Sequence, residues 1–309
     1  MRYNPRLHFK AHLLKALAWK LAGWFPASPA PAGELVVLNY HGTQRAFQKS
    51  FEEQIRYFRD HFRLLAPDEL DEYSSNVARV MKEPALLLSF DDGLKNNLNA
   101  ASVLAKYGIK AIFFVIPALV QAPWDKQLEV FRRFVRPNVN SDIDNLREDL
   151  SPMSWDDLKG LVTDGHEIGC HSYTHALLAN TKDEVDLHHE IVESKHVIES
   201  SLGVEEGAVR SFCGPVDSML SLGVPEMTLI MEHYAYCFSS YPGSNKHDFN
   251  PFFIKRVNVE AYWMLPTVAY AMSRLDWPRW HRKRAAFSRV VQKASGFQQK
   301  PVHVYTTKE

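Results

Sequence analysis

Two short stretches of this sequence carry side chains whose types and spacing could do chemistry. Asp91 and Asp92 stand side by side after the run 86–90, and His171 and His175 follow about 80 positions later. Adjacent carboxylates repel each other, and a bound cation is the simplest way to offset their charge. Two imidazoles and one carboxylate form the three-ligand set of a catalytic zinc site, which leaves one position open for water. The pattern therefore indicates a metal-dependent centre.

These side chains need backbone elements that position them. The run 86–90 is largely apolar and ends abruptly at the two aspartates, and a helix-like segment, 94–106, follows it. A buried parallel strand reads as a near-continuous hydrophobic run, and α/β proteins place their chemistry just beyond the carboxyl ends of such strands. The stretch 165–175 is a second short strand that runs into a loop with both histidines. Both groups of candidate ligands are thus expected at strand ends.

The remaining sequence alternates between strand-like and helix-like stretches. The first core strand is expected at 35–42, with His41 at its exit. Further strands are expected at 110–116, 209–212, 234–238 and 253–257, helices at 51–61, after Ser154 and at 182–202, and an insertion at 124–150. This alternation favours a parallel-stranded barrel or an open parallel sheet.

Composition and charge limit the class to which this protein can belong. With 309 residues, of which 46% are hydrophobic, the chain can bury the core of one barrel-sized domain or two smaller ones. The formal net charge is zero, but residues 1–33 hold five Lys/Arg and no Asp/Glu, and residues 263–309 hold nine against two. Both ends are therefore basic around an acidic middle. The proline-rich stretch 26–31 is the clearest boundary in the sequence.

Three cysteines and the hydropathy pattern bear on location. An odd, small number of cysteines in a chain of this size argues against a disulfide framework and fits a reducing compartment. Lys10, Lys15 and Lys20 interrupt the apolar stretch near the N-terminus, which makes it a poor secretory signal. No run approaches the ~20 apolar residues of a spanning helix. We therefore expect a cytoplasmic protein.

The two motifs also carry a family resemblance. Ser89-Phe90-Asp91-Asp92-Gly93 and His171-Ser172-Tyr173-Thr174-His175 resemble the first two motifs of the polysaccharide deacetylases, carbohydrate esterase family 4, which share the NodB-homology domain. The resemblance extends in order from about residue 35 to about residue 259. It implies a distorted (β/α) barrel with fewer than eight strands. The implied domains are an N-terminal segment and linker (1–33), a catalytic domain (34–262) and a basic C-terminal extension (263–309).

The resemblance also implies roles for individual residues. Asp92, His171 and His175 would bind a divalent metal, expected to be Zn²⁺ from the donor set, and Asp91 would act as general base toward a metal-bound water. The family's third motif aligns with 212–217, where Pro215 is kept and the backbone N–H of Val216 would serve the oxyanion.

Two departures from the family pattern concern catalytic partners. Cys213 stands where the arginine that orients the base aspartate is expected, and Arg256, ahead of a hydrophobic strand, is the candidate replacement. The late Leu-x-Leu-x-His motif, which supplies the family's general acid, is not found. His41, a substrate group or water could take that role.

The leading hypothesis is a metal-dependent hydrolase that removes an N-acetyl group from an acetylated amino sugar, in a glycan or a lipid-linked glycan intermediate of polysaccharide biosynthesis. The same site could cleave an O-acetyl ester. The rival hypothesis is a catalytically silent relative that binds glycan or membrane. The basic ends would either contact an anionic membrane surface peripherally or cap the barrel. No nucleic-acid partner is expected.

Overall fold

The computed structural model describes residues 30–76, 83–130, 150–180, 184–215, 222–246, 249–273 and 278–298. The predicted N-terminal segment, 1–33, lies almost wholly outside the described residues. So do Val216 and most of the predicted insertion at 124–150, where only its first and last parts are described.

The described chain contains one sheet of eight parallel strands, in the order β7-β6-β5-β4-β3-β1-β8, with the short β2 beside β3. Their bounds are β1 Leu35–Tyr40, β2 Arg63–Leu64, β3 Ala85–Phe90, β4 Ile112–Val115, β5 Glu167–Cys170, β6 Ser211–Cys213, β7 Tyr236–Phe238 and β8 Arg256–Asn258. The two edges approach each other, because Phe238 at the end of β7 forms a parallel bridge with Ile254 just before β8. The sheet is thus a nearly closed barrel, which confirms the predicted distorted (β/α) barrel. The predicted strand number was wrong, because the sheet has eight strands when the two-residue β2 is included.

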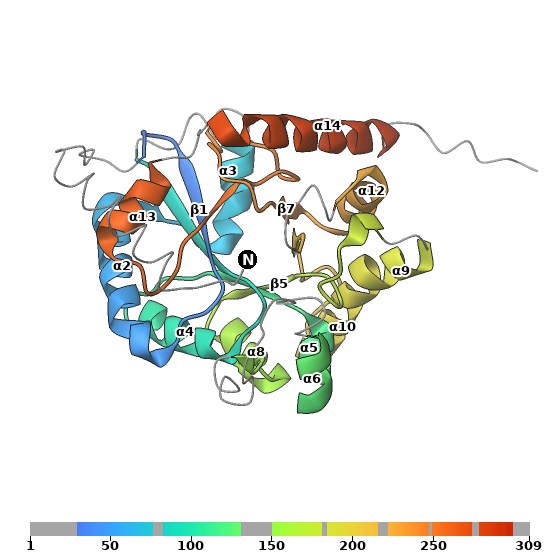
Figure 1. Cartoon of the computed structure of the whole chain (residues 1–309), viewed down its shortest axis with the longest axis horizontal. Coiled ribbons are helices and arrows are strands. Elements are labelled where there is room, and N and C mark those ends of the chain that lie inside the picture. The colour runs from blue at the N-terminus through green and yellow to red at the C-terminus, as the bar shows by residue number, and fades with distance from the viewer. Residues whose placement is uncertain are drawn as a thin grey trace, which may run out of the picture.

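Helices surround the strands (Figure 1). Their bounds are α2 Gln48–His61, α3 Leu70–Asn76, α4 Leu98–Ala105, α5 Pro117–Gln121, α6 Trp124–Val130, α8 Trp155–Thr163, α9 Glu184–His188, α10 Ser194–Leu202, α12 Val224–His233, α13 Leu265–Met272 and α14 His281–Gln298. The predicted N-cap of α8 is present, since Ser154 Oγ accepts from the backbone N–H of Asp157 over 3.2 Å. None of the described helices combines the length and the apolar composition that a membrane-crossing helix needs.

Strand alternation divides the hydrophobic core into two layers. Leu35 and Val37 of β1 join Ala85 and Leu87 of β3 in a cluster inside the barrel. The residues between them face outward into the larger cluster under the helices. Successive strand residues point to opposite faces. The inward series of β3 therefore continues through its last residues to Asp91, beyond the carboxyl end of the strand.

Two predicted elements differ in the structure. The predicted helix 182–202 is described from Glu184 and is interrupted, because a π-helical segment, His189–Glu193, separates α9 from α10. The predicted strand 253–257 appears later, as β8, because residues before Arg256 pair with β7 only through the single bridge at Ile254.

The C-terminal helix α14 packs on the domain through an apolar face. Phe287, Val291 and Ala294 are buried, and Trp280, just before the helix, packs against Tyr241 with ring centroids 6.0 Å apart. The exposed side of the helix carries cationic side chains: Arg282, Lys283, Arg289 and Lys293. Charge, rather than the Trp280 ring, is therefore what this helix presents to its surroundings.

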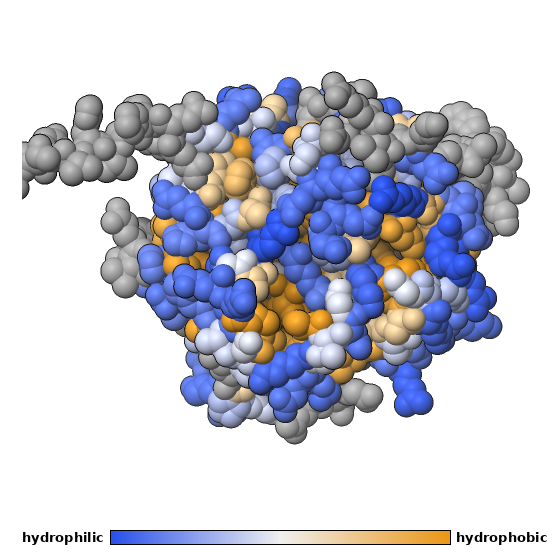
Figure 2. All heavy atoms as spheres, turned by 180° about the vertical axis from the view of Figure 1, so that it is seen from behind, coloured by the Kyte–Doolittle hydropathy of each residue, from blue (hydrophilic) through white to orange (hydrophobic). Residues whose placement is uncertain are grey.

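Figure 2 shows the molecule from behind, where apolar atoms lie in hollows between hydrophilic rims. A cavity of about 460 Å³ lies between the start of β5 and the ends of α8 and α10, and Val162, Ile168 and Val204 are among its lining residues. It lies at the amino end of β5, away from the carboxyl end that leads to His171.

Candidate active site

The predicted site residues meet at the carboxyl end of the barrel. Asp91 and Asp92 follow β3, and His171 and His175 follow β5, two strands away in the sheet. All four are at most 5% exposed. Parallel strands end at the same edge of a barrel, so two motifs that are far apart in sequence lie together here.

The three predicted metal ligands converge on one point. Asp92 Oδ1 lies 3.7 Å from His171 Nε2 and 3.7 Å from His175 Nε2. The donor atoms of the three residues all lie within 4.8 Å of one another. Two ligand atoms bound tetrahedrally to one zinc ion, each at about 2.1 Å, are about 3.4 Å apart. The donor set and its spacing therefore fit a divalent metal ion with little movement.

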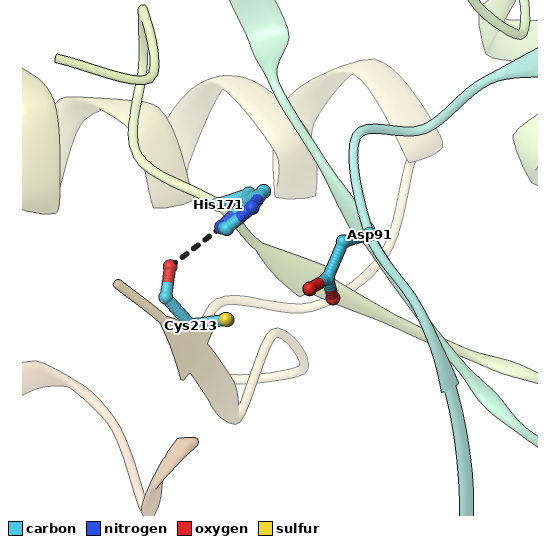
Figure 3. A group of neighbouring side chains, drawn as sticks. All are labelled: Asp91, His171 and Cys213. Carbon is cyan, nitrogen blue, oxygen red and sulfur yellow. Dashed lines mark hydrogen bonds between the residues drawn. The ribbon is translucent and has the colours of Figure 1, made fainter. Parts of the chain in front are cut away.

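The tautomer of His171 is set by a backbone group. His171 Nδ1–H donates to the carbonyl oxygen of Cys213 over 2.7 Å, as Figure 3 shows. Its Nε2, on the side of Asp92, is then the unprotonated nitrogen, which is the form that binds a metal. A neighbouring strand, β6, thus orients a ligand of β5.

The backbone is strained at the ligands themselves. Asp92, Ser172 and His175, with φ of 69°, 59° and 65°, are the non-glycine residues of the described chain that have positive φ. Such conformations are costly for residues with a Cβ, and they persist where the surroundings determine them. Gly93 also has positive φ, 63°, and an added Cβ would lie 3.2 Å from Val115 Cγ1. The two loops are therefore shaped to aim the three ligands.

The predicted partner of Asp91 is in contact with it. Arg256 Nη1 and Nη2 donate to the two carboxylate oxygens of Asp91 over 2.7 and 2.9 Å. Its other donors reach Ser239 O, Ser89 Oγ and Cys213 Sγ, at 3.0, 3.1 and 2.8 Å. Burial raises the pKa of Asp91, but the attraction of the Arg256 guanidinium outweighs it and holds that pKa well below its usual range. Asp91 is therefore an ionised carboxylate at physiological pH.

Cys213 explains how an arginine from β8 reaches this position. Its small side chain faces the barrel interior from β6 and accepts a hydrogen bond from Arg256. Asp91, His171 and Cys213 also lie close enough to hold a metal (Figure 3). That set fits a cation less well, because the Arg256 charge already contacts two of its members, and burial raises the pKa of the Cys213 thiol well above its usual value.

The other predicted site residues lie around this centre. His41 follows β1 with its ring partly exposed, close enough to Asp91 to contribute to lowering the pKa of that carboxyl. Pro215 is buried two positions after β6. Val216, the predicted oxyanion donor, lies outside the described residues.

Three polar residues to which the sequence analysis gave no role support the site. Asn39 Nδ2 donates to Asp91 Oδ2 over 3.4 Å, and Ser89 Oγ accepts from Arg256. Glu190, on the π-helical segment, accepts from the loop that carries His175. Asn39 and Ser89 are polar residues at inward positions of apolar strands, a signal that the sequence contains. Glu190 has no such signal.

The chain was compared with known proteins and structures. Residues 78–220 match the family model described as polysaccharide deacetylase. The comparison with curated protein sequences finds no match.

Several solved structures share the fold. A deacetylase from Streptococcus pyogenes, PplD, solved in complex with acetate, has a TM-score of 0.60 at 16% identity, over 77% of this chain and 98% of that one. IcaB from Ammonifex degensii has a TM-score of 0.58 at 22% identity, over 78% and 97% of the two chains. A polysaccharide deacetylase from Bacillus cereus has a TM-score of 0.55 at 21% identity, over 78% and 69%.

The two sources of similarity agree with the site geometry. The structural matches establish the fold, and the family match covers both motifs, Asp91-Asp92 and His171 to His175. Arg256 and His41 lie outside the matched residues, so their placement comes from the structure alone. Residues 78–220, which contain both motifs, are therefore similar to the polysaccharide deacetylase family, whose members are hydrolases that act on carbon–nitrogen bonds of acetylated sugars.

Proposed function

We propose that this protein is a metal-dependent hydrolase that removes an N-acetyl group from an acetylated amino sugar of a glycan or lipid-linked glycan. The observation that carries the proposal is the adjacency of two arrangements on consecutive residues. Asp92 faces His171 and His175 at 3.7 Å, while Asp91 is held by Arg256. One aspartate is thus free to ligate a cation, and its neighbour is kept ionised beside it.

The ligand set defines what a bound ion would do. Asp92, His171 and His175 would hold it, and a zinc ion would lower the pKa of a water toward ~7 and polarise the acyl oxygen. Three protein ligands leave a coordination position for substrate chemistry. Each of the three donor groups is buried, so few other polar groups compete for the site.

Asp91 has the properties of the general base. It is ionised, and its Oδ1 keeps a lone pair beyond the one that Arg256 occupies, whereas Oδ2 accepts from both Arg256 and Asn39. Arg256 and Asn39 fix its orientation, which such a base requires. A water oxygen would bond to the acyl carbon as Asp91 accepts its proton, a role typically worth ~10²–10⁴-fold in rate.

The departing amine needs a proton when the carbon–nitrogen bond breaks. We propose His41 as the donor, because its partly exposed ring lies near Asp91 at the end of β1. We propose the backbone N–H of Val216, after Pro215, as the donor to the oxyanion. The products are a free amino sugar and acetate.

We further propose that residues 34–262 form the catalytic domain, flanked by the segments 1–33 and 263–309. The exposed cations of α14 and the basic composition of residues 1–33 support a peripheral contact with an anionic membrane surface on the cytoplasmic side. Such a contact would bring a lipid-linked glycan to the site.

The experiment that tests the function measures acetate release together with metal content. The purified chain would be assayed on N-acetylglucosamine oligosaccharides and on a chromogenic acetyl ester, with and without added Zn²⁺. We expect release from the amide that is abolished by a chelator and restored by metal. Release from the ester alone would make the protein an O-acetyl esterase, and release from neither would support the catalytically silent alternative.

A further inference from the structure

The loop that carries His175 is held by a glutamate that lies outside both sequence motifs. Glu190 Oε2 accepts from the backbone N–H of Thr174 over 2.9 Å, and Glu190 Oε1 accepts from Thr174 Oγ1 over 2.6 Å. The backbone carbonyl of Glu190 accepts from the N–H of Tyr173 over 3.1 Å. One residue therefore makes three hydrogen bonds to the two residues that precede His175.

This loop needs such support. Ser172 and His175 both have positive φ, and Ser172 Oγ accepts from the backbone N–H of His175 over 3.0 Å. That bond fixes the loop internally, but it does not attach the loop to the rest of the domain. Two neighbouring elements attach it: the N–H of Ala118 on α5 donates to the carbonyl oxygen of Tyr173 over 3.0 Å, and the Glu190 carboxylate holds Thr174, next to His175. Glu190 is 7% exposed, and hydrogen bonds to a buried carboxylate are stronger than neutral ones.

Glu190 reaches the loop because the helix is π-helical at this point. The segment His189–Glu193 lies between α9 and α10, and its carbonyl groups have side-chain partners. Ser194 Oγ donates to Glu190 O and Ile191 O over 2.8 and 3.0 Å, and Tyr234 OH donates to Ile191 O over 2.6 Å. π-Helical turns are rare and occur often at functional sites. Here the turn is held in place from two sides.

The π-helical turn also has a geometric consequence. One added residue rotates the preceding part of a helix by about 100° relative to the part that follows. The downstream residues Ile198 and Leu202 remain packed in the core cluster under the sheet. Glu190 can then face the metal-ligand loop without moving α10 away from the barrel.

We propose that Glu190 is a positioning residue for the metal site, which acts through Thr174 to hold His175 in its ligating conformation. Glu190 does not belong to the donor cluster of Asp92, His171 and His175. The inference rests on the proposed function, since it assigns Glu190 a part in building that same site. Removal of a group that orients a metal ligand typically lowers the metal affinity 10–100-fold.

The test measures Zn²⁺ affinity of the full chain by competition with a chromophoric chelator, after metal removal. Glu190→Ala should bind Zn²⁺ about 10–100-fold more weakly than the wild type. Thr174→Val loses only the hydrogen bond of the hydroxyl group, so its Zn²⁺ affinity should decrease by a smaller factor than that of Glu190→Ala. Glu190→Gln can accept from the N–H of Thr174 and donate to its hydroxyl, and should stay closer to the wild type than Glu190→Ala.

The matched control is Glu193→Gln. Glu193 lies on the same π-helical segment, but its side chain is 48% exposed and faces His188. It should bind Zn²⁺ as the wild type does. Melting temperatures of the metal-free variants separate positioning from general stability.

Wild-type affinity in folded Glu190→Ala, or in Thr174→Val if the alanine variant does not fold, would overturn the proposal, even where the melting temperature falls. Acetate release by the wild type is measured in parallel. Zinc binding without acetate release would overturn the proposed function and leave the role of Glu190 to be judged on affinity. A wild-type chain that binds no zinc would overturn both.

Discussion

Arg256 binds both carboxylate oxygens of Asp91, over 2.7 and 2.9 Å, from a position 165 residues further along the chain. The two residues belong to β8 and to the end of β3, strands that β1 separates in the sheet. The guanidinium lies inside the barrel, where Cys213 of β6 leaves room for it. The contact therefore joins three strands around the predicted base.

Arg256→Ala should act through Asp91. Arg256 lowers the pKa of Asp91, so its removal raises that pKa, and the carboxylate is protonated up to a higher pH. The acidic limb of the kcat/KM profile should move to higher pH. Removal of one partner of a buried ion pair also destabilises a fold by about 3–5 kcal/mol, so the profile is measured below the lowered melting temperature.

A second arginine–aspartate pair provides the control for Arg256→Ala. Arg210 contacts Asp71 at 2.6 Å at the other end of the barrel, where both side chains are partly exposed. Arg210→Ala should leave the acidic limb in place. An unmoved limb in Arg256→Ala as well would show that this arginine does not set the ionisation of the base.

Asp91→Asn should retain metal and lose hydrolysis. The amide has nearly the shape of the carboxylate but cannot accept the water proton, so kcat should fall by about 10²–10⁴-fold. Metal content and kcat are measured on the same preparation. Retention of more than about a tenth of wild-type kcat would exclude Asp91 as the base.

His171→Ala and His175→Ala should each lose bound metal while the fold remains. The loss follows from the shared position of both Nε2 atoms around Asp92 Oδ1, since two remaining ligands bind a divalent ion far more weakly than three. Elemental analysis and circular dichroism check the two expectations. His196→Ala, at an exposed histidine on α10, is the control and should keep its metal. Stoichiometric metal in the double variant would reject the ligand assignment.

Glu167, at the amino end of β5, should make stability fall as the pH rises. Burial raises the pKa of this carboxyl to about 7, and its Oε1 has no hydrogen-bond partner among the described residues. In the unfolded chain, a glutamate carboxyl has a pKa near 4.3. Between about pH 4.5 and 7 the folded state therefore binds more protons than the unfolded state, so the free energy of unfolding decreases as the pH rises.

The corresponding variant is Glu167→Gln, whose side chain does not ionise. Its denaturant midpoint should exceed that of the wild type at pH 8 and approach it at pH 4.5. Glu206→Gln, an exposed glutamate, serves as the control and should follow the wild type at both values. A constant difference between Glu167→Gln and the wild type across this range would contradict the raised pKa.

Membrane contact can be measured with vesicles. Each basic side chain near an anionic leaflet contributes on the order of 1 kcal/mol, so the chain should sediment with anionic vesicles and dissociate as salt increases. Removal of residues 1–33, or replacement of Arg282, Lys283, Arg289 and Lys293 by glutamine, should reduce binding. Equal recovery in the supernatant with neutral and anionic vesicles would leave the basic ends without this role.

The sequence alone was sufficient to predict the features that depend on residues close together in the chain. The strand before Asp91, the loop after β5 and the N-cap at Ser154 are read from neighbouring residues, because hydrophobic runs and capping patterns act over a few positions. The grouping of Asp92 with both histidines followed from the rule that parallel strands end at one edge. The choice of a barrel over an open sheet came from the family resemblance.

Tertiary structure decided the groups that orient those residues. The contact of Arg256 with Cys213 spans 43 positions, that of Asn39 with Asp91 spans 52, and that of Glu190 with Thr174 spans 16. Each depends on which strands are neighbours, on the length of a side chain across the barrel, or on one added residue in a helix. Such contacts have no local pattern, because their energy exists only once the barrel has brought the partners together.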